Sequence, residues 1–240
     1  MSAAGCCAGG ERWADMHPVR ATFGRLRETA VELRRCRQGF LMLLAFLIYN
    51  DGIGTIIRMA TVYGEELKLD SNVMIAAILV VQFVGIPCSF LFGSLAGVLG
   101  VKRSIMLGLI VYTLICVVGY SMKTEAHFLI LAGLVGVVQG GTQALSRSLF
   151  ASLIPRSKSG EFFGFFAVVE KFAGIFGPAM FAAINFAFGS SRNAILGVIA
   201  FFVVGGLLLV MVDVDEGQRQ AREWDLREST EPAVEPIPSA

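Results

Sequence analysis

The sequence predicts an all-α membrane protein in which six transmembrane helices form one bundle, built as two three-helix units. Three observations predict this fold. Of the 240 residues, 55% are hydrophobic and only 16% are charged, whereas soluble domains carry about 25% charged residues. Long stretches, 73–101 among them, contain no Asp, Glu, Lys or Arg and match the roughly 20 helical residues that cross a bilayer core. The polar residues inside the stretches follow a similar order in the first three and the last three.

Six apolar segments give the expected spans. They cover 39–62, 73–98, 104–122, 127–149, 161–186 and 193–213. We expect helices because an open strand in lipid would leave its backbone groups unsatisfied, and because the segments do not alternate in polarity as barrel strands do. The transmembrane bundle is therefore expected over 38–213, between a basic N-terminal segment, 1–37, and a C-terminal tail, 214–240.

Both ends of the chain are polar. The tail 214–240 mixes charges of both signs and ends in a Pro-containing stretch, so we expect it to be disordered, and we expect the same of residues 1–22. Over 23–37, charged residues alternate with Leu, Val and Ala. This pattern indicates an amphipathic cytoplasmic helix or a linker near the membrane surface.

Loop charges predict that both termini face the cytoplasm. Seven Arg lie in 1–37, and the loops after the second and fourth spans are basic. The loop after the first span, 64–70, is acidic and is expected outside. Basic residues concentrate in cytoplasmic loops of membrane proteins. The chain is therefore expected to be a multi-pass integral protein, most simply of the plasma (inner) membrane.

The first and fifth spans carry ionised side chains at membrane depth. A charge at the centre of a lone membrane helix costs about 2.5–3.5 kcal/mol on insertion scales, so these groups need partners or a water-filled path. We expect Asp51 to pair with Lys171. The other expected pairing sets Glu170 against Arg58 or Arg147. The alternative to a role in handling a solute or a proton is a purely structural ion pair. The expected substrate or coupling-ion pathway comprises Asn50, Asp51, Arg58, Gln82, Gln139, Gln143, Arg147, Glu170 and Lys171.

Glycine and proline predict close packing and bends. Glycines four residues apart let membrane helices approach one another. Pro87 and Pro178 lie inside the second and fifth spans, where proline frees a backbone carbonyl and bends a helix. The two bends are either hinges or fixed features. The glycine pairs are Gly93 and Gly97, Gly136 and Gly140, and Gly160 and Gly164.

Three stretches resemble the major facilitator superfamily. The junction at 93–103, GSLAGVLGVKR, is similar to the cytoplasmic loop motif of that superfamily, with Gly97 at the acidic position and Val98 at the first basic position. The stretches 46–56, FLIYNDGIGTI, and 140–155, GGTQALSRSLFASLIP, followed by EFFGFF at 161–166, resemble the unidentified-major-facilitator branch, which is related to vacuolar amino-acid effluxers. The resemblance implies a cytoplasmic gating loop that contains Gly93, Gly97, Lys102 and Arg103.

The resemblance covers about 23–213 and matches only the C-terminal half of family members, which have twelve spans. It implies that the first and fourth spans line a central cavity, that the second and fifth flank it, and that the third and sixth face lipid. The expected function is secondary transport of a small, amino-acid-like solute by alternating access, as an efflux permease, symporter or antiporter. A coupling proton is expected on Asp51 or Glu170. A second six-helix half would come from another chain or from a homodimer.

A truncated or split membrane protein with a scaffold or regulatory role is the alternative function. An enzyme is not expected, because the chain has only two histidines, His17 and His127, and neither an H-E-x-x-H motif nor a G-x-S-x-G elbow. We therefore expect no catalytic residue and no cofactor. The five cysteines lack metal-binding spacing, so no metal is expected. A net charge of +1 gives no indication of a nucleic-acid partner.

Overall fold

The computed structural model describes residues 29–34, 36–66, 70–121, 124–188 and 191–230. Nearly all of these residues are helical, and no strand occurs among them. Five helices in this part of the chain are long and apolar enough to cross a membrane, and a sixth candidate arises when a helix pair bent by 60° is counted as one span. The predicted fold class, an all-α membrane bundle, is confirmed.

The helices follow the predicted spans closely. A short helix at 29–34 precedes the bundle, and its Leu33 is fully buried. The fifth predicted span is divided in two by a break at Gly174 and Ile175. The elements are α2 (Arg37–Glu66), α3 (Ser71–Leu99), α4 (Val101–Tyr120), α5 (Glu125–Ser152), the 3₁₀ helix η1 (Arg156–Lys158), α6 (Ser159–Ala173), α7 (Phe176–Phe188), α8 (Ser191–Met211) and α9 (Val214–Thr230).

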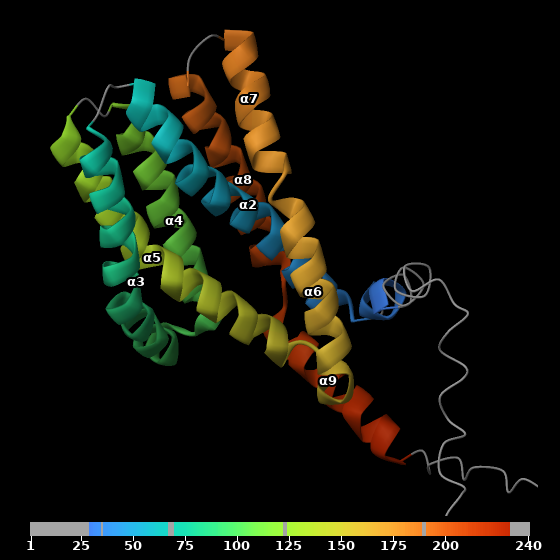
Figure 1. The fold of residues 1–240 in the computed structure, drawn as a ribbon. Helices are drawn as coiled ribbons and strands as arrows, with labels where there is room; N and C mark the ends of the chain where they lie inside the picture. Colours follow the sequence, from blue (N-terminus) through green and yellow to red (C-terminus); the bar gives the residue numbers. More distant parts are fainter. Residues whose placement is uncertain (1–28, 35, 67–69, 122–123, 189–190, 231–240) are drawn as a thin grey trace, which may run out of the picture.

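The contacts between helices repeat from the first three spans to the last three. The first span of one unit packs on the third span of the other, so α2 packs on α8 and, in the matching way, α5 packs on α4. The third and sixth spans, α4 and α8, contact each other between the units. The second span, α3, packs along α5, while in the fifth span α6 contacts α2 and α7 contacts both α2 and α8 (Figure 1). This pairing is what two related three-helix units require.

Aromatic side chains fill the bundle core. Phe46 of α2 stacks on Phe166 of α6 with ring centroids 4.6 Å apart, and Phe150 of α5 lies 5.1 Å from the same Phe166 ring. On the other side of the bundle Tyr112 of α4 stacks on Phe202 of α8 at 5.3 Å. Such pairs contribute about 0.5–1.5 kcal/mol beyond the burial of their area. They hold α2, α5 and α6 together at one end, and α4 and α8 together elsewhere.

Glycine packing is concentrated between α3 and α5. A Cβ added at Gly136 would lie 2.9 Å from the Val81 carbonyl oxygen, and one at Gly140 would lie 2.9 Å from the Gly85 carbonyl oxygen. Both neighbours are backbone atoms, which cannot move aside. The predicted role of Gly136 and Gly140 is confirmed. The same prediction is wrong for two glycine pairs that have no atom within 4 Å of an added Cβ: Gly93 with Gly97, and Gly160 with Gly164.

A single glycine joins α3 to α4. Gly100 has a φ of +88°, a conformation that glycine adopts without strain. Directly after it, the Lys102 ammonium donates hydrogen bonds to the carbonyl oxygens of Val210 and Val212, at 2.9 Å and 2.6 Å. A cation is favourable at this place because the C-terminal end of α8 carries a partial negative charge. The α3–α4 junction is thereby tied to the point where α8 ends and α9 begins.

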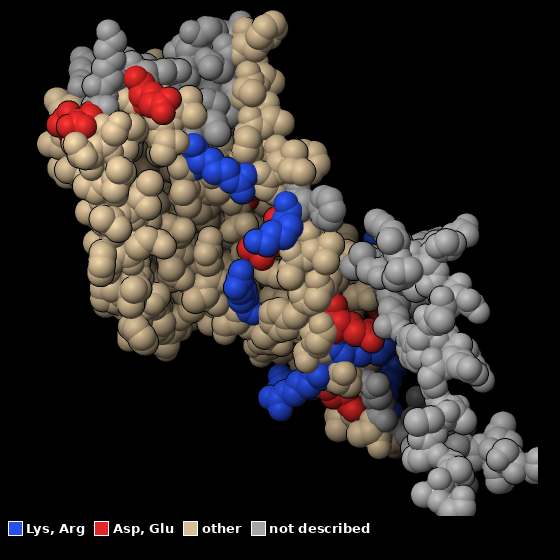
Figure 2. Space-filling model, viewed as in Figure 1, with Lys and Arg blue, Asp and Glu red and all other residues tan. Residues whose placement is uncertain are grey.

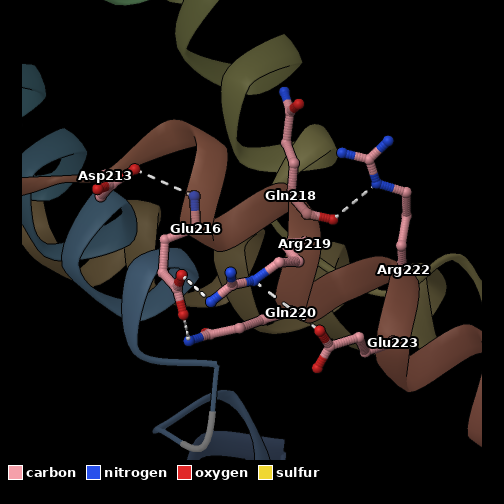
Figure 3. Close-up of polar contacts among 7 residues, drawn as sticks. All are labelled: Asp213, Glu216, Gln218, Arg219, Gln220, Arg222 and Glu223. Carbon is pink, nitrogen blue, oxygen red and sulfur yellow. Dashed lines mark hydrogen bonds and ion pairs between the residues drawn. The ribbon is translucent and has the colours of Figure 1, made fainter.

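The expected disorder of the tail is wrong for residues 214–230, which form α9. Asp213 accepts a hydrogen bond from the Glu216 backbone N–H at 3.0 Å and so caps the helix. Glu216 in turn accepts from Arg219 at 2.5 Å and from Gln220 at 2.8 Å (Figure 3). Pairs at these spacings stabilise a helix by about 0.2–0.5 kcal/mol each. Residues 231–240 lie outside the described part of the chain.

Helix α9 also packs on the rest of the protein. A Cβ added at Gly217 would overlap the Leu153 side chain, and Ala221 is buried. The Asp225 carboxylate accepts hydrogen bonds from the backbone N–H groups of Arg156 and Ser157, at 3.2 Å and 3.4 Å. It therefore caps the start of η1, which has no side-chain cap of its own. The expectation for 1–22 lies outside the described residues, as do residues 23–28.

Candidate functional site: a polar face on α2, α5 and α6

Asp51 lies in the middle of α2 and is buried against α7. The residue is 4% exposed, and neither carboxylate oxygen has a hydrogen-bond partner of ordinary geometry. The Gly177 backbone N–H and the Arg58 guanidinium lie near enough to act on the carboxylate electrostatically. The fully buried Thr55 donates its hydroxyl to the Asp51 carbonyl oxygen at 2.7 Å. Burial of an ionised carboxylate without a hydrogen-bond partner costs free energy unless the group is paired with a cation or takes up a proton.

Arg58 lies two turns further along the same face of α2. Its guanidinium donates through Nη1 to the carbonyl oxygen of Gly174, at the break between α6 and α7. The Arg58 side chain remains exposed on the outside of this contact. The predicted pairing of Arg58 with Glu170 is therefore replaced by a contact with the backbone. The reason is that the break supplies a free acceptor at that depth.

Glu170 of α6 pairs with Arg147 of α5. The Nη2 atom of Arg147 lies 3.3 Å from Oε1 of Glu170, which confirms one of the predicted pairings. The predicted pairing of Asp51 with Lys171 is wrong, since no ion pair joins them among the described residues. Adjacent helical residues point about 100° apart. When Glu170 turns toward α5, the neighbouring Lys171 is directed to the exposed surface.

Two further polar contacts join α2 to α5. Gln143 donates an amide hydrogen to the Asn50 side-chain oxygen at 3.5 Å, so the structure brings these two predicted residues together. Nearby, the hydroxyl of Tyr49, which directly precedes Asn50, lies 2.5 Å from the hydroxyl of Ser146, one turn after Gln143, and both residues are fully buried. Ser146 donates its single hydroxyl hydrogen to the Thr142 carbonyl oxygen at 2.5 Å. Tyr49 therefore donates to Ser146.

Gln82 and Gln139 line a cavity rather than the charged face. The cavity has a volume of about 330 Å³ and is walled by α2, α3, α4, α5 and α8, mostly with aliphatic and aromatic side chains. Thr55 also lines it, from the α2 turn that follows Asp51. The Gln139 side-chain oxygen is buried and has no hydrogen-bond partner. The cavity thus offers one unused acceptor within an apolar wall.

The faces of the bundle differ sharply in polarity. Figure 2 shows basic and acidic side chains in a line across the face formed by α2, α5 and α6, beside a broad uncharged surface, with further charged side chains toward the two ends of the molecule. Arg58, Arg147 and Lys171 are exposed there. By contrast, the exposed outer residues of α3, α4 and α8 are large and apolar, which suits contact with lipid. These residues include Phe83, Phe90, Ile110, Leu114, Val203 and Leu207.

The expected gating-loop residues lie at the α3–α4 junction. Gly93 and Gly97 are exposed on α3, and Arg103 is exposed at the start of α4. Lys102 is the member of this set with a defined contact, its two hydrogen bonds to the end of α8. A gating role for the loop stays a prediction. Within the described ranges, no three His, Cys, Asp or Glu side chains gather as a metal site would need.

The site residues predicted from the sequence do not include three members of this site: Tyr49, Thr55 and Ser146. Hydroxyl-bearing residues inside apolar helices are common and usually bond to their own helix. Only the pairing of α2 with α5 shows that Tyr49 and Ser146 meet, and only the nearness of α7 shows that Thr55 lies beside the helix break. One signal was present, since Tyr49 and Thr55 flank the Asn50–Asp51 pair in the stretch that resembles the family.

Comparison with known proteins agrees with this architecture. The family described as "Vacuole effluxer Atg22 like" matches residues 12–222. The chain belongs to the Atg22-like family. Its resemblance to the major facilitator superfamily, read from residues 46–56 and 140–155, is thereby confirmed. The family is one of transporters and not of enzymes, so the Atg22-like chain is a protein of a transporter family with multiple apolar membrane helices.

Several relatives of the Atg22-like chain are known by sequence. It is 42% identical over 196 residues to YxiO of Bacillus subtilis, an uncharacterised MFS-type transporter, covering 82% of this chain and 46% of YxiO. It is 27% identical to autophagy-related protein 22-1 of Penicillium rubens, covering 82% of this chain and 36% of that protein. It is 28% identical to autophagy-related protein 22 of Cryptococcus neoformans, covering 82% of this chain and 39% of that protein. The chain thus spans less than half the length of these relatives.

Proposed function

We propose that this chain is one six-helix half of a twelve-helix secondary carrier that moves a small solute by alternating access. Two facts support the proposal. The chain matches a transporter family yet spans 46% of YxiO. Its six helices also leave one face uncovered that carries charged and amide side chains. A second half, from another chain or from a second copy, would cover that face and complete a central path.

The observation that carries the proposal is the contrast between faces. Ionised side chains within membrane-depth helices normally face a bundle interior or water. Here Arg58, Arg147, Glu170 and Lys171 share the face of α2, α5 and α6, whereas the outward sides of α4 and α8 are apolar. A carrier half needs this division, because one side meets lipid and the other meets a solute path.

Asp51 is the proposed carrier of a coupling proton, in either symport or antiport. Both of its carboxylate oxygens are buried without a hydrogen-bond partner, so a proton would remove an uncompensated charge. Glu170 is the weaker candidate, since Arg147 already compensates its charge. The solute is proposed to be amino-acid-like, with efflux as the direction, by analogy with the family description.

The proposed orientation places both termini in the cytoplasm, in the plasma membrane. The basic residues Lys102, Arg103, Arg156 and Lys158 lie at the end of the bundle where α2 begins and α8 passes into α9, and the positive-inside rule favours the cytoplasm for this end. On this orientation α9 and η1 lie on the cytoplasmic side. Asp51 and the break at Gly174 lie near mid-membrane.

Transport by the protein isolated with any partner from its own membrane tests the proposal. The isolated material is reconstituted into liposomes with an imposed pH gradient, and the movement of labelled amino acids is measured. We expect gradient-dependent transport that Asp51→Asn reduces at least tenfold. The matched control is Asp215→Asn on the exposed surface of α9, which should transport like the wild type. Transport that is unaffected by Asp51→Asn would refute the proton role.

A scaffold or regulatory role without transport is the second candidate. One observation favours it, since the chain covers less than half of each relative described above. The same reconstitution separates the two functions. If the isolated assembly contains no second six-helix half and moves no solute in either direction, the scaffold role replaces the carrier. A homodimer or heteromer that transports excludes it.

A further inference from the structure

The break in span five leaves one backbone carbonyl without its helical partner. In an α-helix the carbonyl of residue 174 would accept from the N–H of residue 178. Residue 178 is a proline and has no N–H. The regular pattern resumes one residue later, where the Ala179 N–H donates to the Ile175 carbonyl oxygen at 3.2 Å. Gly174 therefore carries the acceptor that span five itself cannot satisfy.

Arg58 of α2 supplies the missing donor. Its Nη1 hydrogen goes to the Gly174 carbonyl oxygen, in the place of the absent Pro178 amide. The approach is close, because a Cβ added at residue 174 would lie 2.7 Å from Nη2 of Arg58 and the guanidinium would have to shift. The guanidinium also places a positive charge at the C-terminal end of α6, where a helix carries a partial negative charge.

Asp51 occupies the opposite position at the start of α7. Gly177 lies in the first turn of α7, and a Cβ added there would be 3.1 Å from the Asp51 Oδ1 atom and would overlap the Thr55 hydroxyl. The N-terminal end of a helix carries a partial positive charge and favours an anion. Asp51 and Arg58 are seven residues apart and share a face of α2. Helix α2 therefore places the Asp51 carboxylate at the positive N-terminal end of α7 and the Arg58 guanidinium at the negative C-terminal end of α6.

We propose that Asp51 and Arg58 form a charge clasp that holds the two parts of span five against α2 and that opens when Asp51 takes up a proton. Arg58 is then a positioning residue, and Gly174 and Gly177 are the close-approach points of the clasp. A role of the clasp in proton coupling rests on the carrier function proposed above. The existence of the clasp does not rest on that function. Loss of the Asp51 charge removes the anion at the start of α7 and leaves Arg58 as an unbalanced cation.

The other charged groups around Asp51 are few. Helix α7 carries no titratable side chain over Phe176–Phe188. On α6 the nearest charges are Glu170, which Arg147 of α5 compensates, and the exposed Lys171. Helix α8 contains one charged residue, Arg192, whose side chain lies outside the described part. Arg58 is therefore the described charge that acts on Asp51.

Span five is also suited to movement. Only 7% of the residues in its apolar part are buried within the molecule, compared with 50% for α2. The α6 end is held by the aromatic contacts of Phe166 and by the Arg147–Glu170 pair. The α7 end packs on α8 and on α2, and its contact with α2 includes the close approach of Gly177 to Asp51 and Thr55. Opening of the clasp would therefore loosen α7 from α2, while α6 keeps its aromatic contacts and its ion pair.

Hydrogen exchange, measured separately at two fixed pH values, tests the clasp without any transport assay. The full-length protein in nanodiscs is compared with Asp51→Asn at pH 8 and at pH 5, using peptides from α7, with α3 peptides as the internal reference. At pH 8 we expect α7 amides in the variant to exchange about five- to thirty-fold faster, the range for losing a charge at a partly buried helix N-terminus. At pH 5 the difference should nearly vanish.

Further variants separate the clasp from general loss of folding. Arg58→Gln should also speed exchange around the break, whereas Arg147→Gln, which breaks the neighbouring ion pair, should leave α7 unchanged. Wild-type α7 exchange, normalised to α3 at the two pH values, supplies the comparison without a substitution. Equal α7 protection in wild type, Asp51→Asn and Arg58→Gln at pH 8 would overturn the clasp. That result would leave the carrier proposal standing, and a failed transport assay would leave the clasp standing.

Discussion

Two seams of the bundle occupy equivalent positions in the three-helix repeat, yet they are built in opposite ways. The seam between α3 and α5 joins the second span to the fourth, and the seam between α6–α7 and α2 joins the fifth to the first. Each contains a Gly-Pro element, at Gly85 to Pro87 and at Gly174 to Pro178. In the first, α3 continues through Pro87 as one helix. In the second, the span divides into two helices.

What lies opposite the glycines accounts for the difference. At the α3–α5 seam, glycines face backbone, with Gly140 against the Gly85 carbonyl oxygen. Dense contact of this kind is the main source of helix association in lipid. At the α2–α7 seam, Gly174 and Gly177 face the polar side chains of Arg58, Thr55 and Asp51. A similar glycine-proline element therefore serves as a packing seam in one unit and as a polar junction in the other.

The largest expected effect comes from breaking the packing seam. Gly140→Val forces α3 and α5 apart at a backbone contact that cannot relax, and we expect a loss of about 1–3 kcal/mol of unfolding free energy. Gly97→Val is the matched control, because nothing lies within 4 Å of an added Cβ there. Unfolding by SDS in mixed micelles measures both. Equal midpoints for the two variants would show that the seam is not glycine-dependent.

Two substitutions, singly and combined, test the contact between Gly177 and Thr55 at the polar seam. Gly177→Ala places a methyl group on the Thr55 hydroxyl, and we expect a loss of about 1 kcal/mol, at the low end for an overpacked site. Thr55→Ala removes that hydroxyl and should restore part of the loss in the double variant. A double variant that is less stable than Gly177→Ala alone would mean that Thr55 and Gly177 do not meet.

The Arg147–Glu170 pair should matter less for stability. Its Arg147 side chain is 55% exposed, and pairs of this kind contribute about 0.2–1 kcal/mol. A double-mutant cycle with Arg147→Gln and Glu170→Gln measures the coupling, and the reversed pair Arg147→Glu with Glu170→Arg should recover most of it. Coupling that is zero within error would show that the ion pair does not stabilise the fold.

The smallest effect is on reactivity at the base of α2. Burial, with a further contribution from the Glu32 carboxylate, raises the pKa of the Cys36 thiol. Less thiolate is then present at any given pH, so maleimide labelling of Cys36 should be slower than that of an unfolded reference and should rise only at higher pH. Peptide mass spectrometry measures the labelling. Rapid labelling near neutral pH would show that the Cys36 thiol at the base of α2 is accessible to solvent and not buried.

Much of the fold was predictable because the bilayer imposes length and polarity on each span. The six predicted segments fall on the observed helices, and Gly174 with Pro178 indicated where the fifth would bend. The sequence could not say which bend becomes a break, since that depends on the side chains of another helix. Helix α9 was missed although Asp213 and Glu216 have the spacing of a capping box. The mixed charges that suggested disorder are the same ones that pair along this helix.

The candidate site was predictable by residue type but not by pairing. Charges at membrane depth identified Asp51, Arg58, Glu170 and Lys171, because few other residues there are ionised. Their partners depend on helix rotation, which a change of one residue alters by about 100°. That rotation brought Glu170 to Arg147 and turned Lys171 outward. The backbone acceptor at Gly174 could not have been found from side chains alone.

Accessibility of spin labels in a bilayer tests most directly whether the charged face is turned away from lipid. Nitroxides placed singly at Gln143 and Lys171 on that face, and at Leu114 and Leu207 on the apolar side, are compared for collision with oxygen and with a water-soluble nickel chelate. The account predicts that labels at 143 and 171 collide mainly with the chelate and that labels at 114 and 207 collide mainly with oxygen. Oxygen-dominated collisions at all four positions would contradict it.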